Sequence, residues 1–286
     1  MTADLSASLD ALTGLAGTLP VSLPVLAACV LVMSMASVVF GMSGFGASLI
    51  TVPLLSQLVP LPLLLSMTVA TDLLSACIVS ASARWRAARG RGLAVATGAA
   101  TPPPLVRADR AELLRLGSTA VLGAAIGVTL LVGLPRQASM AALGVFLFGY
   151  GLWSLRARIP DRPLSARWAW PSGFIGGLLG TLFGIGGPPY VIYLTRRIID
   201  RDRLRATIAV IVLISLLIRF IVFMAAGLLL QPGLPQLLAV LLPVCAIGVL
   251  AGGRLVERLS RERLLRVIAA VLTASGALLL ARVAAS

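Results

Sequence analysis

The chain has 286 residues, of which 59% are hydrophobic and only 12% are charged. About a quarter of the residues in a water-soluble domain are charged, so this composition excludes such a domain and predicts an integral membrane protein. The formal net charge of +14 does not indicate a nucleic-acid-binding protein, because the arginines cluster between apolar runs and form no basic helical face.

The N-terminal segment, residues 1–19, contains Asp4 and Asp10 but no basic residue ahead of its apolar stretch. It therefore lacks the charged start of a secretory signal peptide. We expect the first long apolar run, which follows this segment, to be retained as a membrane helix.

Eight apolar runs of about 20 residues recur along the chain, and this is the length that an α-helix needs to cross a hydrocarbon core of about 30 Å. Helices are expected because lipid offers no hydrogen-bond partner to a free backbone group. The runs lie near residues 20–42, 62–83, 112–133, 137–156, 168–185, 204–228, 234–253 and 263–281. Two further pieces, Ala47–Leu58 and Pro188–Thr195, are too short to cross alone, and each follows a glycine-rich break. The predicted fold class is an all-α integral membrane protein.

The distribution of arginine predicts how these helices are oriented. Four loops hold 21 of the 24 basic residues, and the positive-inside rule places all four in the cytoplasm. They are residues 84–115, 156–167, 196–205 and 254–266. Only one long run separates the second loop from the third, so the chain must reverse inside the membrane, at Gly184-Ile185-Gly186-Gly187-Pro188-Pro189. The sequence predicts a broken helix or re-entrant hairpin there.

The same order of segments occurs in the first half of the chain. Gly44-Phe45-Gly46 corresponds to Gly184-Ile185-Gly186, and the next matching threonines, Thr68 and Thr207, follow at nearly equal distances. We interpret this as an internal repeat. Each repeat is expected to contain a glycine-broken helix or re-entrant hairpin and three transmembrane helices. Because the two hairpins are predicted to open to opposite faces, the repeats are inverted, as is typical of secondary transporters.

The predicted domain organisation follows from this repeat. After the N-terminal segment, the first repeat spans residues 20–156 and includes a cytoplasmic loop at 84–111. A cytoplasmic linker at 157–167 leads to the second repeat, residues 168–286.

The glycine breaks are the first candidate binding site. Glycine unwinds a helix at low steric cost, and proline suits the first turn of the next helix because its missing N–H would be unpaired there. The half-helix that follows points its N-terminal amides and positive dipole end into the membrane, which favours an anion. The candidate substrate-binding residues at the breaks are Gly44, Gly46, Ala47, Gly184, Gly186, Gly187 and Pro188. Glycines also allow close helix packing, the interpretation we favour for Gly41 and Gly180.

Two formal charges, Asp72 and Arg219, stand well inside long apolar runs. Ionisable groups at that depth usually face a partner or a wet cavity. Arg219 is a candidate ligand for a substrate oxyanion and Asp72 for a coupling proton. The alternatives are a structural ion pair or an Arg219 side chain that snorkels to the outer interface. Three threonines, Thr51, Thr68 and Thr207, are candidate hydroxyl donors to the substrate, although threonine in a membrane helix more often bonds its own backbone or a neighbouring helix.

Enzymatic chemistry is not supported. The chain has no histidine, and it shows no paired carboxylates at an active-site spacing, no nucleophile elbow and no phosphate loop. Its three cysteines, Cys29, Cys77 and Cys245, lie inside apolar runs without metal-ligand spacing. We therefore expect no catalytic residue, no metal and no cofactor.

Several of these motifs together resemble the sulfite exporter TauE/SafE family of anion permeases. In the first half they are Gly44-Phe45-Gly46, Thr51-Val52-Pro53-Leu54-Leu55 and Thr68. In the second half they are Gly173-Phe174-Ile175-Gly176-Gly177, Gly184-Ile185-Gly186-Gly187-Pro188 and Arg205-Ala206-Thr207. The resemblance covers most of the chain apart from residues 1–19 and the loop at 86–110.

The resemblance implies a multi-pass permease of the bacterial inner membrane that moves sulfite or an organosulfur anion, such as a sulfonate or thiosulfate, by alternating access. The partners expected are a small anion and membrane lipid, with no nucleic acid, and a homo-oligomer is compatible with the sequence. Two alternatives stay open: a permease for a non-sulfur anion such as a small carboxylate, and a membrane scaffold that transports nothing.

Overall fold

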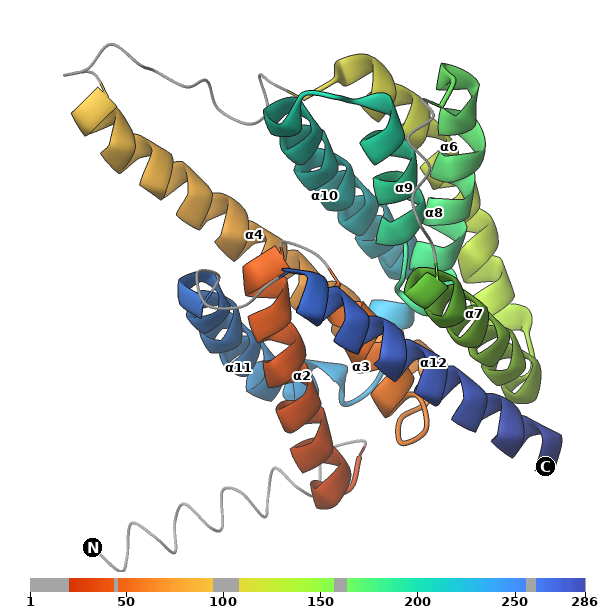
Figure 1. The fold of residues 1–286 in the computed structure, drawn as a ribbon. Helices are drawn as coiled ribbons and strands as arrows, with labels where there is room; N and C mark the ends of the chain where they lie inside the picture. Colours follow the sequence, from red (N-terminus) through yellow and green to blue (C-terminus); the bar gives the residue numbers. More distant parts are fainter. Residues whose placement is uncertain (1–20, 44–45, 95–107, 157–163, 256–260, 286) are drawn as a thin grey trace, which may run out of the picture.

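A computed structural model describes residues 21–43, 46–94, 108–156, 164–255 and 261–285 of the chain (Figure 1). These residues form helices joined by short connections and contain no strand, which confirms the all-α fold class. The helices are α2 (Leu23–Ser43), α3 (Ala47–Leu55), α4 (Leu61–Ala94), α6 (Arg110–Gly133), α7 (Arg136–Arg156), η1 (Ala166–Trp168), α8 (Ala169–Phe183), α9 (Gly187–Arg197), α10 (Arg201–Ala225), η2 (Leu228–Leu230), α11 (Leu234–Leu255) and α12 (Arg261–Ala285).

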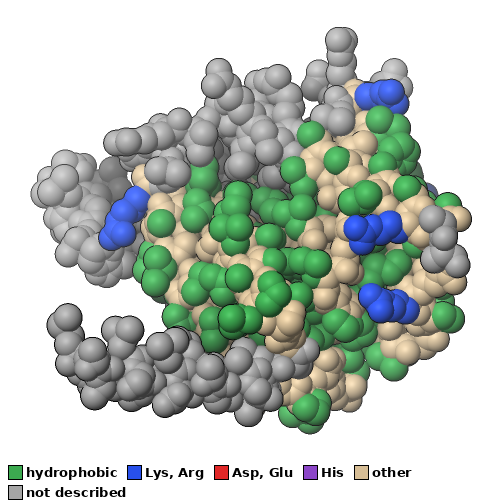
Figure 2. All heavy atoms as spheres, turned by 90° about the horizontal axis from the view of Figure 1, so that it is seen from below, with side chains coloured by type: hydrophobic (Ala, Val, Ile, Leu, Met, Phe, Trp, Pro, Cys, Tyr) green, Lys and Arg blue, Asp and Glu red, His purple; other side chains and the backbone are tan. Residues whose placement is uncertain are grey.

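Five helices in the described part of the chain are long and apolar enough to cross a membrane. They are Leu23–Met42, Leu61–Ala81, Arg110–Gly133, Ala206–Ala225 and Leu234–Arg254. Large apolar side chains lie exposed on these helices, among them Leu31, Leu122 and Ile221, and apolar side chains cover much of the face in Figure 2. A surface of this kind suits lipid as the surrounding solvent.

The largest difference from the predicted boundaries is at the end of α4. The loop expected to begin at residue 84 is helical up to Ala94, where α4 ends. Alanine and arginine are among the strongest helix formers, so the segment that follows the apolar run continues the helix into the basic region. The rest of the expected loop, residues 95–107, lies outside the described residues.

The reversal expected in the second half is present between α8 and α9. Gly184 adopts a left-handed conformation with φ of +75° and ends α8, and its N–H donates to the carbonyl of Gly180 at 3.0 Å. Glycine tolerates this conformation without a Cβ clash. Helix α9 then runs back along α8. The two helices are in close contact, since a Cβ built on Gly176 of α8 would lie 2.4 Å from the Tyr190 ring of α9. The N–H of Leu164 donates to the carbonyl of Arg196 at 3.3 Å, which places both ends of the hairpin at the same end of the molecule.

The main helix contacts join the two halves of the chain. Helix α2 packs on α11, α8 on α6, and α7 on α12. Glycine makes these approaches close: a Cβ on Gly252 of α11 would lie 2.0 Å from the carbonyl oxygen of Val38, and one on Gly41 would lie 2.2 Å from that of Val249. Small residues at such crossings are typical of membrane bundles, and this agrees with the packing role predicted for Gly41.

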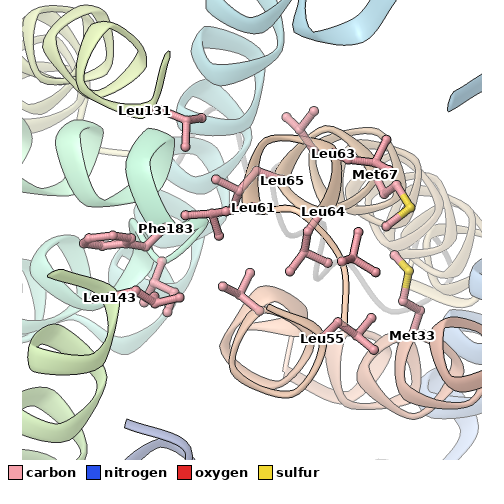
Figure 3. Close-up of a cluster of buried hydrophobic side chains, with 14 of the residues drawn as sticks. Met33, Leu55, Leu61, Leu63, Leu64, Leu65, Met67, Leu131, Leu143 and Phe183 are labelled. Atoms are coloured by element: carbon pink, nitrogen blue, oxygen red, sulfur yellow. The ribbon is translucent and has the colours of Figure 1, made fainter. Parts of the chain in front are cut away.

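A large cluster of buried apolar side chains surrounds the ends of α3 and α8 (Figure 3). Leu55 of α3, Leu64 of α4 and Phe183 of α8 belong to it, and each is at most 3% exposed. Because these helices come from both halves, the cluster holds the first short helix against the second hairpin.

Candidate functional site

A small cavity of about 60 Å³ lies where the two glycine breaks meet. It is lined by the N-terminal ends of α3 and α9 and by side chains of α2, α4 and α10. The two breaks are in contact, since a Cβ built on Gly184 would lie 3.2 Å from the Cβ of Ser48. The cavity has room for only a few water molecules or one small ion.

Two helix N-termini face this cavity. Gly46, with φ of +94°, precedes α3, and Gly186 precedes α9, whose first turn carries prolines. The first N–H groups of a helix have no partner inside the helix, and the dipole adds a partial positive charge at that end. In α9 the first turn contributes the N–H of Gly187, because Pro188 and Pro189 have no N–H. Both ends contribute partial positive charge to the cavity, which favours an anion there.

Arg219 of α10 adds a full positive charge to the cavity wall. Its side chain is only 3% exposed. Its Nη2 donates to the Leu65 carbonyl at 2.9 Å and to Thr68 Oγ1 at 2.8 Å, both on α4. Its Nε has no hydrogen-bond partner among the described residues. This burial excludes snorkelling and leaves one donor of a buried cation available to a ligand.

Asp72 of α4 lines the same cavity and is 6% exposed. Its Oδ2 accepts a hydrogen bond of 2.5 Å from Ser48 Oγ on α3. The close ion pairs of the described residues lie elsewhere, so Asp72 and Arg219 face the cavity without forming a direct pair.

The structure brings most of the predicted site residues together. The cavity is lined by Gly46, Asp72, Gly184, Gly186, Gly187, Pro188 and Arg219. Gly44 lies outside the described residues. Gly180, for which the sequence favours a packing role, also lines the cavity, and a Cβ on it would lie 3.3 Å from Gly186 Cα.

Four predicted residues are not part of the cavity wall. Ala47 is buried in α3, and the hydroxyl of Thr51 donates to the Ala47 carbonyl at 3.0 Å. Thr68 stands behind Arg219 as its hydrogen-bond acceptor. Thr207 precedes Arg219 by twelve residues on α10, which corresponds to about 18 Å of helix, and it lies at the other end of the molecule.

Sequence reasoning missed three polar residues of the wall, namely Ser48, Tyr190 and Ser215. The Tyr190 hydroxyl and Ser215 Oγ are 3.3 Å apart. Ser215 precedes Arg219 by one helical turn, a spacing that puts both side chains on one face and could have identified it. Tyr190 follows the two prolines, and only the folding of α9 back along α8 brings it to the cavity.

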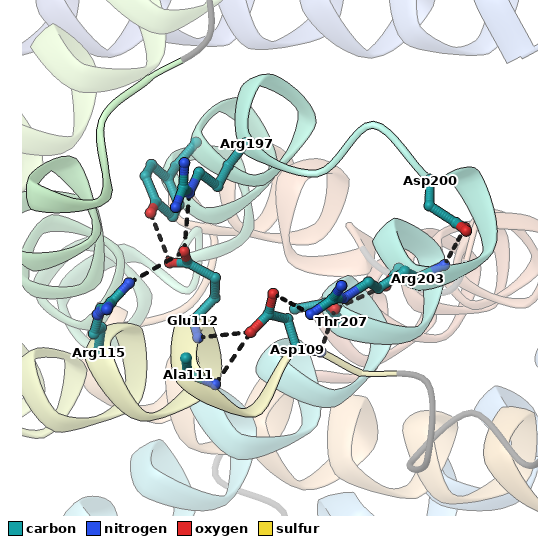
Figure 4. A network of polar contacts seen from close by, with 9 residues as sticks. Asp109, Ala111, Glu112, Arg115, Arg197, Asp200, Arg203 and Thr207 are labelled. Atoms are coloured by element: carbon teal, nitrogen blue, oxygen red, sulfur yellow. Dashed lines mark hydrogen bonds and ion pairs between the residues drawn. The ribbon is translucent and has the colours of Figure 1, made fainter.

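A second polar network occupies the end of the bundle where α6 begins (Figure 4). Glu112 is 3% exposed and accepts hydrogen bonds from Tyr193 Oη at 2.6 Å, Arg197 Nε at 3.1 Å and Arg115 Nη1 at 3.3 Å. The hydrogen bond to Glu112 raises the pKa of the Arg197 guanidinium above its ordinary value. The network ties α6 of the first half to α9 of the second half.

Asp109 extends this network. Its carboxylate caps α6 by accepting from the Ala111 N–H at 3.1 Å, and it pairs with Arg203 of α10 at 2.8 Å. The Asp109 N–H donates to Thr207 Oγ1 at 3.0 Å. Thr207 therefore contributes to the contact between the halves at this end of the molecule.

Comparisons with known proteins give a family and a relative. The family model described as sulfite exporter TauE/SafE matches residues 28–279. The chain is 28% identical over 156 residues to "Probable inner membrane transporter protein TsaS" of Comamonas testosteroni, a region that covers 54% of this chain and 65% of the relative. No solved structure matches the chain. Since the family model spans most of its length, the chain belongs to the sulfite exporter TauE/SafE family.

Proposed function

We propose that the chain is a secondary transporter of the bacterial inner membrane that moves a small anion through the cavity between the glycine breaks. The observation that carries the proposal is the donor set of that cavity: two helix N-termini and a buried arginine, Arg219, whose Nε lacks a partner among the described residues. Membership of the TauE/SafE family and the similarity to TsaS, which is named as a probable inner membrane transporter, support it.

We further propose that residues 20–156 and 168–286 form two inverted repeats that rock against each other to give alternating access. The helix contacts support this proposal, because they come in matching pairs. In the first half, α2 and α4 contact α11 of the second half. In the second half, the equivalent helices α8 and α10 contact α6 of the first half, and α6 is the equivalent of α11. Helices α7 and α12, which would be equivalent, pack on each other, and so do α4 and α10.

The substrate that fits the cavity best is a small oxyanion such as sulfite. The resemblance and the family name favour a sulfur oxyanion, and a volume of about 60 Å³ is too small for a long organic tail. Thiosulfate, a short sulfonate and a small carboxylate present similar oxygens to the same donors, so substrate selection within this group is a question for measurement.

Asp72 is suited to couple anion movement to a proton. With Asp72 ionised, the charges of Asp72 and Arg219 cancel, and a monovalent anion would leave a net negative charge in a buried cavity. Burying an uncompensated charge is costly. If Asp72 takes up a proton with the anion, the loaded cavity is neutral, so the two ions would move together.

Uptake of anions into proteoliposomes tests the transport proposal. Sulfite, thiosulfate, methanesulfonate and acetate should be compared, and at least one should be transported by the wild type. Arg219→Gln should reduce transport by a factor of about 10 or more, because a lost hydrogen bond to a charged partner is worth about 1.5–3 kcal/mol.

Thr51→Ala is the matched control for Arg219→Gln. The Thr51 hydroxyl of the wild type donates to the Ala47 carbonyl of its own helix and does not line the cavity. The Thr51→Ala variant should therefore transport normally. Full activity of Arg219→Gln would contradict the proposed site, and a wild type that moves none of the four anions would favour the scaffold alternative.

A further inference from the structure

Three of the 24 arginines lie outside the four basic loops: Arg136, Arg219 and Arg282. Arg219 lines the central cavity. Arg136 is the first residue of α7 and Arg282 lies in the last turn of α12. Although they are far apart in sequence, both line one second cavity of about 440 Å³. Neither residue belongs to the basic loops that orient the helices, so this convergence requires a reason other than orientation.

The lining of this second cavity is amphipathic. Gln57, which follows the end of α3, adds an amide to the two guanidinium groups. Met140 and Leu279 form the apolar part of the lining, which we call the apolar floor. Met140 and Leu279 are 8% and 4% exposed, whereas both arginines are exposed at the rim. Among the described residues that line the cavity there is no acidic side chain. Two like charges therefore line one cavity that has no carboxylate among its described residues.

The position of the cavity places it at a membrane surface. Helix α6 begins at the Glu112 network and ends at Gly133, next to the start of α7, and its 24 residues span about 36 Å. The cavity is thus at the opposite end of the bundle from that network, where Figure 1 also places the C-terminus. Val132, near the end of α6, and Leu278, which precedes Leu279 on α12, are 63% and 47% exposed apolar side chains, as expected for contact with lipid.

We propose that this second cavity binds the headgroup of an anionic phospholipid, with the phosphate between Arg136 and Arg282. Guanidinium groups bind phosphate oxygens in a bidentate manner, and an anion between them removes their mutual repulsion. The apolar floor accommodates the glycerol and upper acyl segments, and the rest of the chains follow the exposed apolar surface beside Leu278. A free inorganic anion would satisfy the arginines but would leave the apolar floor unused.

Photolabelling tests this assignment on the purified full-length protein. Phosphatidylglycerol with a photoactivatable acyl chain should label peptides that contain Met140 and Leu279. Excess phosphatidylglycerol should compete with the label, whereas phosphatidylcholine should not. The double variant Arg136→Gln/Arg282→Gln should reduce labelling of these peptides by a factor of about 10 or more, and Arg136→Lys/Arg282→Lys should restore part of it, because the charge remains but the bidentate geometry is lost.

Arg254→Gln is the matched control, since Arg254 is an exposed arginine in the last turn of α11 and belongs to a predicted cytoplasmic loop. It should leave the labelling of both peptides unchanged. Equal labelling with a phosphatidylcholine probe, or unchanged labelling in the double glutamine variant, would overturn the proposal. Competition by sulfite or inorganic phosphate as strong as that by phosphatidylglycerol would also overturn it and would indicate a free-anion site.

Labelling is independent of transport. Arg219→Gln, which should lose anion uptake, should retain full labelling of the second cavity. Failure of the lipid proposal can thus be distinguished from failure of the transport proposal.

Discussion

At the scale of single residues, the most informative feature is a buried cation whose hydrogen bonds are incomplete. Arg219 is fixed by two acceptors on α4, its guanidinium lies 5.4 Å from the Phe223 ring centre, and its Nε is left without a partner among the described residues. A buried donor usually has a hydrogen-bond partner, and an anion or a water molecule bound in the cavity would supply one. Asp72, which shares the cavity, supplies the opposite charge and a site for a proton.

The coupling role of Asp72 can be tested by the pH dependence of binding. If the anion binds together with one proton, its affinity should rise by up to about tenfold for each unit by which the pH falls, as long as Asp72 is ionised in the empty cavity. Asp72→Asn keeps the shape of the side chain but cannot titrate, so its affinity should be independent of pH. Thermal-shift titrations with methanesulfonate, whose own charge is constant, measure this.

The comparison with wild type decides the outcome for Asp72. An Asn variant that retains the full pH dependence would show that another group binds the proton. A wild type without pH dependence would remove the coupling proposal while leaving the anion site intact.

At the scale of elements, the α8–α9 hairpin depends on glycine at the turn. A Cβ on Gly186 would lie 2.6 Å from the carbonyl oxygen of Gly176 and 3.0 Å from Gly180 Cα. Both contacts are backbone atoms, which cannot move aside as a flexible side chain can. The position of the α9 N-terminus therefore depends on the close approach of the α8 backbone to the turn, which only glycine allows.

Gly186→Ala should destabilise the protein by about 1–3 kcal/mol, the usual cost of overpacking, and should reduce anion affinity because α9 is displaced. Gly149→Ala on α7 is the control, since a Cβ there meets nothing within 4 Å and alanine favours a helix. Unfolding in a mixed-detergent titration measures both. Equal stability of Gly186→Ala and Gly149→Ala would mean that the turn can relax.

At the scale of the whole molecule, the halves are joined at one end by the Glu112 network. Glu112 of α6 accepts from Tyr193 and Arg197 of α9, and Asp109 pairs with Arg203 of α10. These contacts lie where the halves would have to separate if they rock. The network therefore stabilises the present arrangement of the two halves.

Glu112→Ala should reduce stability by about 2–3 kcal/mol, because it leaves the buried Tyr193 hydroxyl without its charged acceptor. Arg115→Ala is the control: its ion pair with Glu112 is on the same helix and its side chain is 39% exposed, so its loss should cost at most about 0.5 kcal/mol. The same detergent titration compares them. A Glu112→Ala variant as stable as Arg115→Ala would show that the network contributes little.

The proposed orientation in the membrane can be tested by cysteine labelling. In a variant that lacks Cys29, Cys77 and Cys245, single cysteines at Ser165 and Asp200 should react from the same side. A cysteine at Gln137 should react from the opposite side. Reaction of the first two from different sides of intact cells would contradict the hairpin in the membrane and the inverted repeats with it.

The sequence by itself determined the class of the protein, the approximate positions of the helices apart from the extension of α4 to Ala94, and the places where they break. Composition and run length suffice for these, because crossing lipid requires about 20 apolar residues and because only glycine and proline interrupt such a run cheaply. Arginine counting predicted the reversal at Gly184, and the motifs around it identified the family. Asp72 and Arg219 were recognisable because a charge in an apolar run is rare.

Only the tertiary structure decided which other residues reach the cavity. Membrane helices are apolar on every side, so periodicity does not show which face points inward. Helix packing brings together residues that are distant in sequence. Ser48 contacts Asp72, 24 residues away, and Arg219 contacts Leu65, 154 residues away. The same reason explains why Thr207 accepts from the Asp109 N–H and why Arg136 and Arg282 line one cavity. These contacts depend on how each helix is rotated and shifted against its neighbours, which the local sequence does not encode.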